Sequence, residues 1–174
     1  MNPARMALAD RCRQIEALVL DVDGVLTGGG ITYTGEGWEI KTFHVRDGSA
    51  IKQWQKAGKK LGILSGRNSL VTTFRARELG IDAIEQGNAD KIPGFQKLLE
   101  SWGLKAEQVA YMGDDLPDVP ILQQAGLALT PADGCGEAKA VAHYISRYGG
   151  GYGAVRSAIE TILACQGRWP LDAA

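Results

Sequence analysis

The sequence predicts an α/β fold in which helices cover both faces of a Rossmann-like parallel sheet, with a β-hairpin after the first strand. Two observations carry this prediction. Short apolar runs of strand length alternate along the chain with longer segments whose apolar residues recur at helical spacing. Three of the short runs, VLDVD, ILSG and YMGDD, end in polar residues, as strands do where a parallel sheet meets a ligand.

Length and composition limit the classes of protein that fit. The 174 residues, 45% hydrophobic and 22% charged, predict a single globular domain over 1–174. A formal net charge of −1 without a basic stripe argues against nucleic-acid binding. We find no apolar run near the roughly 20 residues that span a bilayer, and no signal-peptide core. The cysteines lack metal-site spacing and suit a reducing compartment. We expect a cytoplasmic protein that binds neither nucleic acid nor membranes.

The N-terminal part predicts two buried strands separated by a hairpin and a helix. The run 17–23 (ALVLDVD) is apolar on both faces until its acids, which is typical of a strand inside a parallel sheet. Alternating runs around GEG predict a hairpin within 31–43. The segment 49–58 has helical spacing and ends at a glycine. The run 60–66 (KLGILSG) is a second buried strand that stops at a glycine turn.

The middle of the chain predicts a helix, a strand and a second helix. The segment 68–80 has helical spacing, with Asn68 as its expected N-cap and a glycine at its end. A short strand is expected at 82–86. The segment 89–103 predicts a longer helix, in which Pro93 is tolerated because it falls in the first turn.

The remaining elements continue the alternation and complete a β-α-β order. We expect strands at 108–115, 126–130 and 143–146, and helices at 116–126, 136–142 and 151–167. Strands that alternate with helices in this way form a parallel sheet with helices on both faces. The carboxyl ends of the strands then meet at one edge, so polar residues distant in sequence are brought to one site.

Acidic residues follow two of these strands. Asp21 and Asp23 end the first strand, and Asp114 and Asp115 end YMGDD. Carboxylates gathered at one edge raise each other's pKa unless a cation lies between them. Oxygen ligands of this kind suit Mg²⁺, which binds few carboxylates together with substrate phosphate. The sequence therefore predicts a magnesium site at this edge.

A phosphate site is predicted beside it. Ser65 and Gly66 offer a hydroxyl and backbone N–H groups before a helix, a natural anion site. Lys91, near the start of the next long helix, adds a positive charge. A carboxylate nucleophile, a metal ion, a hydroxyl and a lysine around one phosphate describe phosphoryl transfer through an aspartyl-phosphate.

Four features follow one another along the sequence: DVDGVLT (21–27), LSGR (64–67), Lys91 and GDDLPD (113–118). The motifs of the haloacid-dehalogenase-like phosphatase superfamily occur in the same order, and the chain resembles that superfamily. More narrowly, it is similar to the 3-deoxy-D-manno-octulosonate 8-phosphate phosphatases and their sugar-acid phosphatase relatives. That similarity rests also on ITYTGEGWEIKTF, HVRDGSAIK, QGNADK and GGGYGAVR. The resemblance implies a Mg²⁺-dependent phosphomonoesterase that releases phosphate and a free sugar acid.

The resemblance also implies roles for the first and last motifs. Asp21 corresponds to the nucleophile, and Asp23 to the general acid and base that protonates the leaving oxygen and later activates water. Asp21, the backbone carbonyl of Asp23, and Asp114 correspond to the magnesium ligands. Asp115 and Asp118 correspond to residues that orient the metal site and the lysine. Asp118 is equally consistent with an acid that interacts with a helix dipole.

The other implied contacts hold the substrate. Ser65, Gly66 and Lys91 correspond to phosphate-binding residues. The residues that correspond to contacts with the rest of the substrate are Arg46, Asp47, Gly48, Arg67 and Arg75. Arginine suits the carboxylate of a sugar acid, because its planar fork binds a carboxylate with two hydrogen bonds.

The stretch between the first two motifs is too short for the separate cap domain that many of these phosphatases carry, so we expect other chains to cover the site. The resemblance implies a homotetramer in which the hairpin flap, about 30–43, joins a central barrel. It also implies that a neighbour's C-terminal tail, about 149–174, closes the site. The glycines of 149–156 predict a mobile lid.

Two alternatives stay open at this stage. The substrate could be a sialic-acid-type 9-phosphate, which the same residues would bind. The chain could instead be a non-enzymatic phospho-acceptor or regulatory module, because receiver domains also combine acids, a hydroxyl and a lysine. Asp23, two residues from the predicted nucleophile, favours the enzyme, because it supplies the proton transfers that turnover requires.

Overall fold

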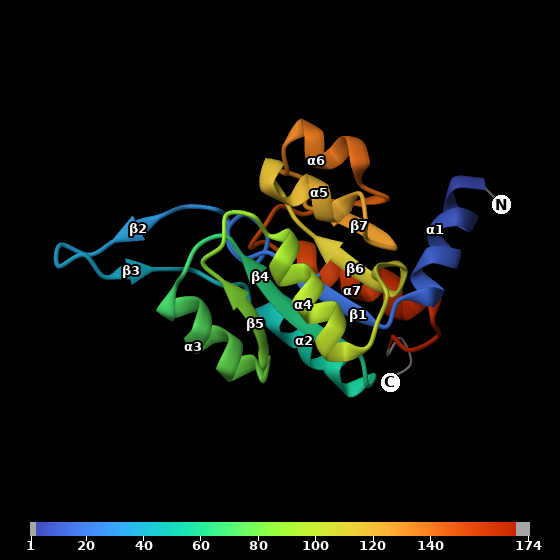
Figure 1. The fold of residues 1–174 in the computed structure, drawn as a ribbon, viewed down its shortest axis with the longest axis horizontal. Coiled ribbons are helices and arrows are strands. Elements are labelled where there is room, and N and C mark those ends of the chain that lie inside the picture. The colour runs from blue at the N-terminus through green and yellow to red at the C-terminus, as the bar shows by residue number, and fades with distance from the viewer. Residues whose placement is uncertain (1–2, 170–174) are drawn as a thin grey trace.

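The computed structural model describes residues 3–169, and its centre is a six-stranded parallel sheet in the order β5-β4-β1-β6-β7-β8 (Figure 1). Its strands are β1 (Ala17–Leu20), β4 (Lys60–Ser65), β5 (Ala83–Gln86), β6 (Val109–Met112), β7 (Leu127–Thr130) and β8 (Tyr144–Ile145). The chain builds outward from β1 through β4 to β5, then returns to the other side of β1 at β6. This reversal sets the carboxyl ends of β4, β1 and β6 side by side. The predicted parallel α/β sheet is confirmed.

Helices cover both faces of this sheet (Figure 1). One face carries α1 (Pro3–Gln14), α2 (Val45–Lys56) and α7 (Ala154–Cys165), with α3 (Leu70–Leu79) at its edge. The other carries α4 (Ile92–Trp102), α5 (Val119–Leu122) and α6 (Gly136–Val141). Two 3₁₀ turns, η1 (Ala106–Gln108) and η2 (Leu116–Asp118), flank β6. Within residues 3–169, no helix has the length and apolarity needed to cross a bilayer.

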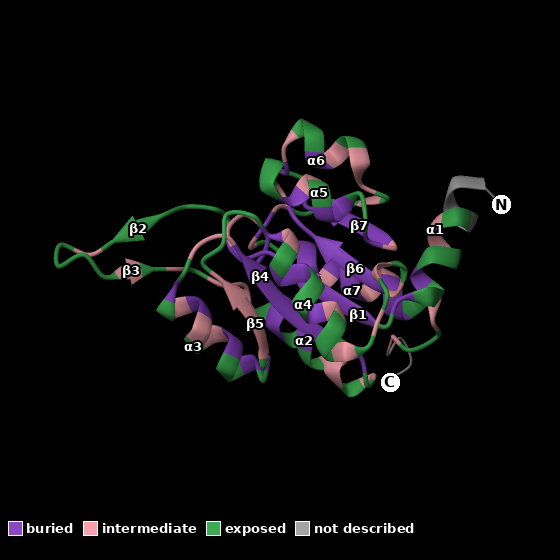
Figure 2. Cartoon of the chain, in the orientation of Figure 1, coloured by how far each residue is buried: buried purple, intermediate pink, exposed green. Residues whose placement is uncertain are grey.

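Alternate residues of β1 face opposite halves of the core. Leu18 and Leu20 pack in the cluster that includes α2 and α7, whereas Val19 packs in the cluster that includes α4 and α5. All three side chains are fully buried, and Figure 2 shows buried residues along the central strands. Burying one such side chain contributes roughly 1.5–3 kcal/mol. The segment that follows Leu20 therefore starts from a strand held on both faces.

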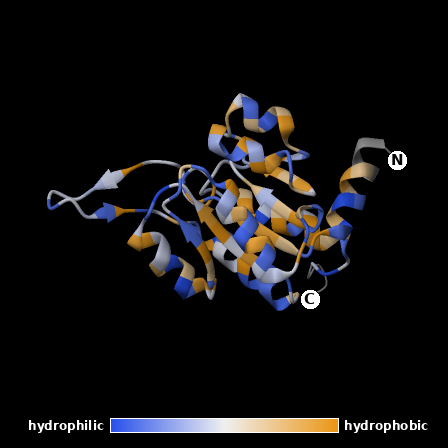
Figure 3. Ribbon diagram, viewed as in Figure 1, coloured by the Kyte–Doolittle hydropathy of each residue, from blue (hydrophilic) through white to orange (hydrophobic). Residues whose placement is uncertain are grey.

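The predicted hairpin is confirmed and projects from the body of the molecule (Figure 1). Its strands, β2 (Thr32–Tyr33) and β3 (Glu39–Ile40), are antiparallel and two residues long. Figure 3 shows hydrophobic residues along the central strands and hydrophilic ones at the hairpin tip. Near the tip, however, Tyr33 and Trp38 leave 57% and 68% of their surface exposed. The hairpin therefore offers apolar side chains to a partner.

Two predicted helix starts are wrong, each for a local reason, and one helix was not predicted. The helix expected at 49–58 begins at Val45, because His44 serves as its N-cap and accepts the Arg46 N–H. The N-cap of α3 is Ser69 rather than Asn68, since the Ser69 hydroxyl accepts the Thr72 N–H. The helix α1 has no counterpart among the predicted elements.

The helix expected at 116–126 divides into η2 and the single turn α5. Pro120 has no N–H to donate to the carbonyl of Leu116, so a continuous α-helix cannot pass through it. The 3₁₀ turn is closed instead by the Asp118 N–H, which donates to the carbonyl of Asp115 at 2.9 Å. This tight turn returns the Asp118 side chain toward the end of β6.

Candidate active site

The first site residue lies directly beyond β1. The Asp21 N–H donates to the carbonyl of Met112 at 3.0 Å, which continues the pairing of β1 with β6. The Asp21 carboxylate accepts the Val22 N–H at 2.6 Å and is 7% exposed. The N–H groups of Val25, Leu26 and Thr27 then converge on the carbonyl of Val22. Asp21 is thus fixed between a rigid strand and a tight turn.

Gly24 is required because the carboxylate of Asp114 passes over it. Its φ of +87° lies in the left-handed region that side chains disfavour. A Cβ added to Gly24 would also lie 2.1 Å from Oδ2 of Asp114. The DxDG pattern therefore brings the loop after β1 and the loop after β6 into direct contact.

Asp118 is fully buried, and both of its oxygens are occupied. Oδ1 accepts hydrogen bonds from Lys91 Nζ at 2.7 Å and from the hydroxyl of Tyr111. Oδ2 accepts the N–H groups of Asp114 at 3.0 Å and Asp115 at 3.2 Å. Asp118 therefore organises the loop after β6 and holds the lysine, and its oxygens are not free to bind a metal ion.

Lys91 joins the two acids. Its ammonium lies 2.8 Å from Asp21 Oδ2 and 2.7 Å from Asp118 Oδ1, and the residue is 5% exposed. Burial alone would lower the pKa of Lys91, but the charges of Asp21 and Asp118 outweigh burial and raise it. Lys91 therefore remains charged, facing the carboxylate predicted to be the nucleophile.

The residues present fit a divalent cation. Carboxylate oxygens of Asp21, Asp114 and Asp118 lie within 4.8 Å of one another, and Oδ1 of Asp114 is buried without a hydrogen-bond partner. Burial and the charges of Asp21 and Asp118 raise the pKa of Asp114 to about 7. Burial raises that of Asp21 to about 6, although the charge of Lys91 opposes this. A dication between Asp21 and Asp114 would favour both charged forms and satisfy the unpaired oxygen.

Asp23 lies on the other side of the site and contacts two cations. Its Oδ1 binds Nζ of Lys41, and its Oδ2 lies 3.2 Å from Nη1 of Arg67. Glu39 in turn accepts Nη2 of Arg67 at 2.7 Å and the hydroxyl of Ser69. Burial would raise the pKa of Glu39, but the Ser69 hydrogen bond and the charges of Lys41 and Arg67 lower it. The root of the hairpin is thereby tied to Asp23.

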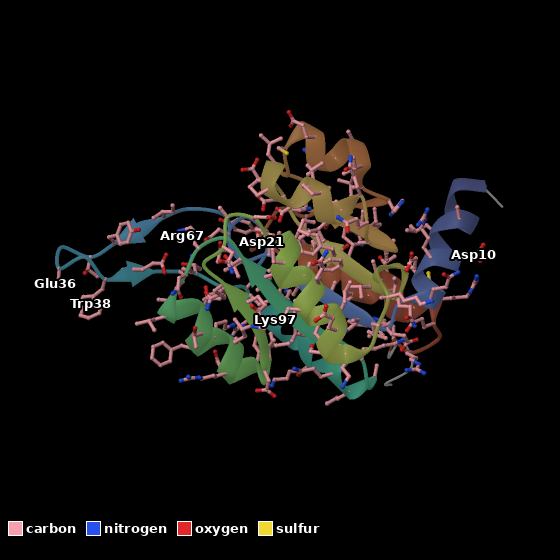
Figure 4. All side chains as sticks on the ribbon, viewed as in Figure 1. Asp10, Asp21, Glu36, Trp38, Arg67 and Lys97 are labelled. Atoms are coloured by element: carbon pink, nitrogen blue, oxygen red, sulfur yellow. The ribbon has the colours of Figure 1, made fainter. Side chains whose placement is uncertain are left out.

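These groups surround a cleft of about 410 Å³ at the carboxyl edge of the sheet. Figure 4 shows Asp21 and Arg67 at this edge, with Trp38 at the far end of the hairpin and Asp10 on the opposite side of the molecule. The predicted residues that line the cleft are Asp21, Asp23, Ser65, Gly66, Arg67, Lys91, Asp114, Asp115 and Asp118. Ser65 ends β4, and its hydroxyl accepts the Arg67 N–H at 3.4 Å.

Four of the five predicted substrate contacts lie elsewhere in the subunit, and Arg67 alone of these five lines the cleft. Asp47 is 1% exposed and accepts the N–H groups of Gly153 at 3.2 Å and Arg156 at 2.7 Å. These N–H groups belong to the N-cap residue and the first turn of α7, so Asp47 caps that helix across the fold. Its role within this subunit is structural.

Gly48 and Arg75 form a second structural contact. A Cβ on Gly48 would lie 2.5 Å from Nη2 of Arg75, so the glycine makes room for the guanidinium. Arg75 also pairs with Glu78 at 2.8 Å and lies over the ring of Phe43. Arg46 lines a separate cavity of about 510 Å³ beside α7. These residues therefore lie outside the cleft of the single subunit, and their contact with substrate stays a prediction.

The glycines expected to form a mobile lid are packed against the first-motif loop of their own chain. A Cβ on Gly150 would lie 1.8 Å from the carbonyl oxygen of Gly24, and one on Gly151 would lie 2.6 Å from the Gly28 nitrogen. The Gly151 N–H donates to the carbonyl of Val25 at 2.9 Å. These glycines permit close backbone packing within their own chain, and their movement as a lid stays a prediction. Residues 170–174 of the expected tail lie outside the described residues.

The sequence analysis did not predict that Lys41, Glu39, Ser69 and Tyr111 contribute to the site. Two signals could have found most of them. Glu39 and Lys41 alternate along a strand-like run, which places both side chains on one face. Tyr111 lies inside an apolar strand, where a buried hydroxyl needs a partner.

Comparison with known proteins agrees with this geometry. A family model described as haloacid dehalogenase-like hydrolase matches residues 38–126. The 3-deoxy-D-manno-octulosonate 8-phosphate phosphatase KdsC of Yersinia pestis is 38% identical over 165 residues, covering 95% of this chain and 88% of that protein. The counterpart from Escherichia coli K12 is 37% identical over 167 residues, covering 96% and 89%.

Solved structures give the same result. A probable YrbI family phosphatase from Pseudomonas syringae pv. phaseolica has a TM-score of 0.91 at 42% identity, covering 94% of this chain and 93% of that one. The Moraxella catarrhalis 3-deoxy-D-manno-octulosonate 8-phosphate phosphatase, in complex with magnesium, phosphate and KDO, has a TM-score of 0.90 at 39% identity, covering 92% of each chain. The chain therefore belongs to the haloacid dehalogenase-like hydrolases, within the family of the 3-deoxy-D-manno-octulosonate 8-phosphate phosphatases.

Proposed function

We propose that this protein is a Mg²⁺-dependent phosphatase that hydrolyses 3-deoxy-D-manno-octulosonate 8-phosphate to the free sugar acid and phosphate. The observation that carries the proposal is the grouping of Asp21, Lys91 and Asp114 at the edge of the sheet, with one Asp114 oxygen buried and unpaired. The Moraxella catarrhalis relative, crystallised with magnesium, phosphate and KDO, supports this substrate.

The first half of the reaction transfers the phosphoryl group to the protein. A carboxylate oxygen of Asp21 attacks phosphorus, the bond from phosphorus to the sugar oxygen breaks, and Asp23 gives its proton to that oxygen. Lys91 offsets the negative charge that Asp21 and the phosphate bring together. Ser65 and the N–H of Gly66 orient the phosphate oxygens. Asp21, Asp114 and the backbone carbonyl of Asp23 would hold magnesium, which would neutralise part of the charge at the phosphate.

The second half of the reaction removes the phosphoryl group from Asp21. Asp23, now a carboxylate, takes a proton from water as the water oxygen attacks phosphorus. The bond from phosphorus to Asp21 breaks, which releases phosphate and returns both residues to their starting states. Asp23 thus acts first as an acid and then as a base.

The decisive experiment measures phosphate release from a panel of phosphate esters with and without a chelator. We expect the highest kcat/KM for 3-deoxy-D-manno-octulosonate 8-phosphate and loss of activity when the chelator removes the metal. A higher kcat/KM for a sialic-acid-type 9-phosphate would change the substrate assignment. Release of only one phosphate per protein molecule would reject the enzyme in favour of a phospho-acceptor module.

We also propose that the protein is a cytoplasmic homotetramer in which the hairpins associate. The exposed Tyr33 and Trp38 side chains support association at the hairpin. Because four predicted substrate contacts lie outside the cleft of their own subunit, any contact they make with substrate requires a neighbouring subunit. The free cysteines of the described chain suit a reducing compartment.

A further inference from the structure

A series of ion pairs links the root of the hairpin to Asp23. Lys41 lies just beyond β3, and its side chain is 2% exposed. Its ammonium binds Oδ1 of Asp23 and lies 3.4 Å from Oε1 of Glu39. Glu39 also binds Arg67 and Ser69, which lie in the loop after β4. The hairpin root therefore contacts both Asp23 and the loop that bears Arg67.

The two cations bind different oxygens of Asp23. Lys41 holds Oδ1, whereas Arg67 is 3.2 Å from Oδ2, and the Arg67 side chain is 36% exposed against 2% for Lys41. A carboxylate held at both oxygens cannot rotate freely about its Cβ–Cγ bond. Arg67 lines the cleft and is placed to turn toward a substrate anion. The Lys41 side chain is buried, so its contact with Asp23 does not require Arg67 to keep its own.

We propose that Lys41 is a positioning residue for Asp23. Its ammonium, itself supported by Glu39, fixes the direction in which the Asp23 carboxyl group faces the leaving oxygen. This inference rests on the proposed function for its chemical consequence, because only a phosphatase uses Asp23 as an acid. Its geometric part, that the orientation of Asp23 depends on Lys41, holds whether or not the chain turns over substrate.

The test compares two classes of ester in the Lys41→Met variant. Departure of an alkoxide from a sugar phosphate needs the proton of Asp23, whereas departure of p-nitrophenolate from p-nitrophenyl phosphate does not. We use kcat/KM because it reports phosphoryl transfer to Asp21 and excludes the later attack of water. Lys41→Arg keeps the charge, and Lys105→Met removes an exposed lysine far from the site as a matched control.

We expect Lys41→Met to lower kcat/KM for the sugar phosphate by about 10- to 100-fold and that for p-nitrophenyl phosphate by less than about 3-fold. Lys41→Arg should recover most of the loss, and Lys105→Met should show none. Equal losses on both esters, or no loss on either, would overturn the proposal. If Lys41→Met does not fold, Lys41→Gln, which is polar but uncharged, replaces it in the same comparison.

Crystal structures of the same variants provide a readout that needs no turnover. In Lys41→Met the Asp23 carboxylate should leave its position or occupy several, while in Lys41→Arg and Lys105→Met it should remain in place. A single unchanged position of Asp23 in Lys41→Met would overturn the proposal. Failure of the wild-type protein to hydrolyse any ester would instead reject the proposed function, and the crystal structures would still decide the role of Lys41.

Discussion

Asp118 and Lys91 form a buried ion pair, with 2.7 Å between Oδ1 and Nζ, beyond the end of β6. The same carboxylate accepts the Tyr111 hydroxyl and two backbone N–H groups. Four donors on one carboxylate make this the most highly connected side chain described at the site. Removal of its charge should therefore disturb both folding and the position of the lysine.

We expect Asp118→Asn to lower the free energy of unfolding by about 2–4 kcal/mol, because an amide cannot accept all four hydrogen bonds and leaves Lys91 with one carboxylate. Urea unfolding measures this loss. Tyr111→Phe is the graded comparison, since it removes one donor and should cost about 1–2 kcal/mol. If Asp118→Asn costs no more than Tyr111→Phe, the ion pair does not carry the stability assigned to it.

Asp21→Asn should reduce phosphate release by at least about 10³-fold, because an amide is a poor nucleophile at phosphorus. The substitution preserves size, so the circular dichroism spectrum and the cooperativity of unfolding should match those of the wild type. Asp10→Asn, at an exposed position on α1, is the matched control and should keep full activity. An Asp21→Asn protein that is pure and active would refute the assignment of the nucleophile.

Gly24→Ala should displace Asp114, because the added Cβ would lie 2.1 Å from its carboxylate and the φ of +87° disfavours alanine. We expect the affinity for Mg²⁺ to fall by about 10-fold or more and stability by about 1–3 kcal/mol. Titration calorimetry and thermal unfolding measure the two effects. Gly30→Ala has open space around the new methyl group and should change neither. Equal behaviour of the two variants would contradict the close approach of the loops.

Magnesium affinity should fall as the pH decreases below about 7, because protons compete with the cation for Asp114, of pKa about 7, and Asp21, of pKa about 6. Calorimetry in buffers of different ionisation enthalpy should show protons released on binding at pH 6.

The same pKa shifts set the pH dependence of stability without metal. Both folded pKa values are raised, so protonation stabilises the metal-free protein at low pH, and this contribution is lost as the pH rises through 6 and 7. Added Mg²⁺ should therefore raise the melting temperature more at pH 8 than at pH 5.5. If Mg²⁺ raised the melting temperature equally at pH 5.5 and pH 8, the raised pKa values would be contradicted.

Trp38→Glu should weaken association at the hairpin, because the side chain is 68% exposed and a charge on an apolar interface is costly to bury. Sedimentation velocity should show smaller species than the wild type at the same concentration. Lys56→Glu, on the exposed surface of α2, controls for the change of charge. A wild-type protein that sediments as a monomer would reject the tetramer.

The sequence by itself determined the alternation of strands and helices, the parallel sheet, and the acids, serine and lysine at its carboxyl edge, whereas the order of the strands within the sheet came from the structure. The features determined by the sequence could be predicted because the spacing of apolar residues and the polar residues at strand ends are both properties of short segments. The positions of helix ends were less secure. Ser69 replaced Asn68 as the cap of α3, and Pro120 divided a helix that the apolar period alone predicted to be continuous.

The tertiary structure decided which polar residues meet. Asp47 and Arg75 carry the same charges as site residues, yet they cap α7 and pack against Phe43, because contacts between distant helices are not written in local spacing. Lys41, which is paired with Glu39, reached Asp23 only because the hairpin root folds back onto the loop after β1. Site residues that directly follow a strand can be inferred from the sequence. Site residues that act through contacts between distant segments can be identified only from the tertiary structure.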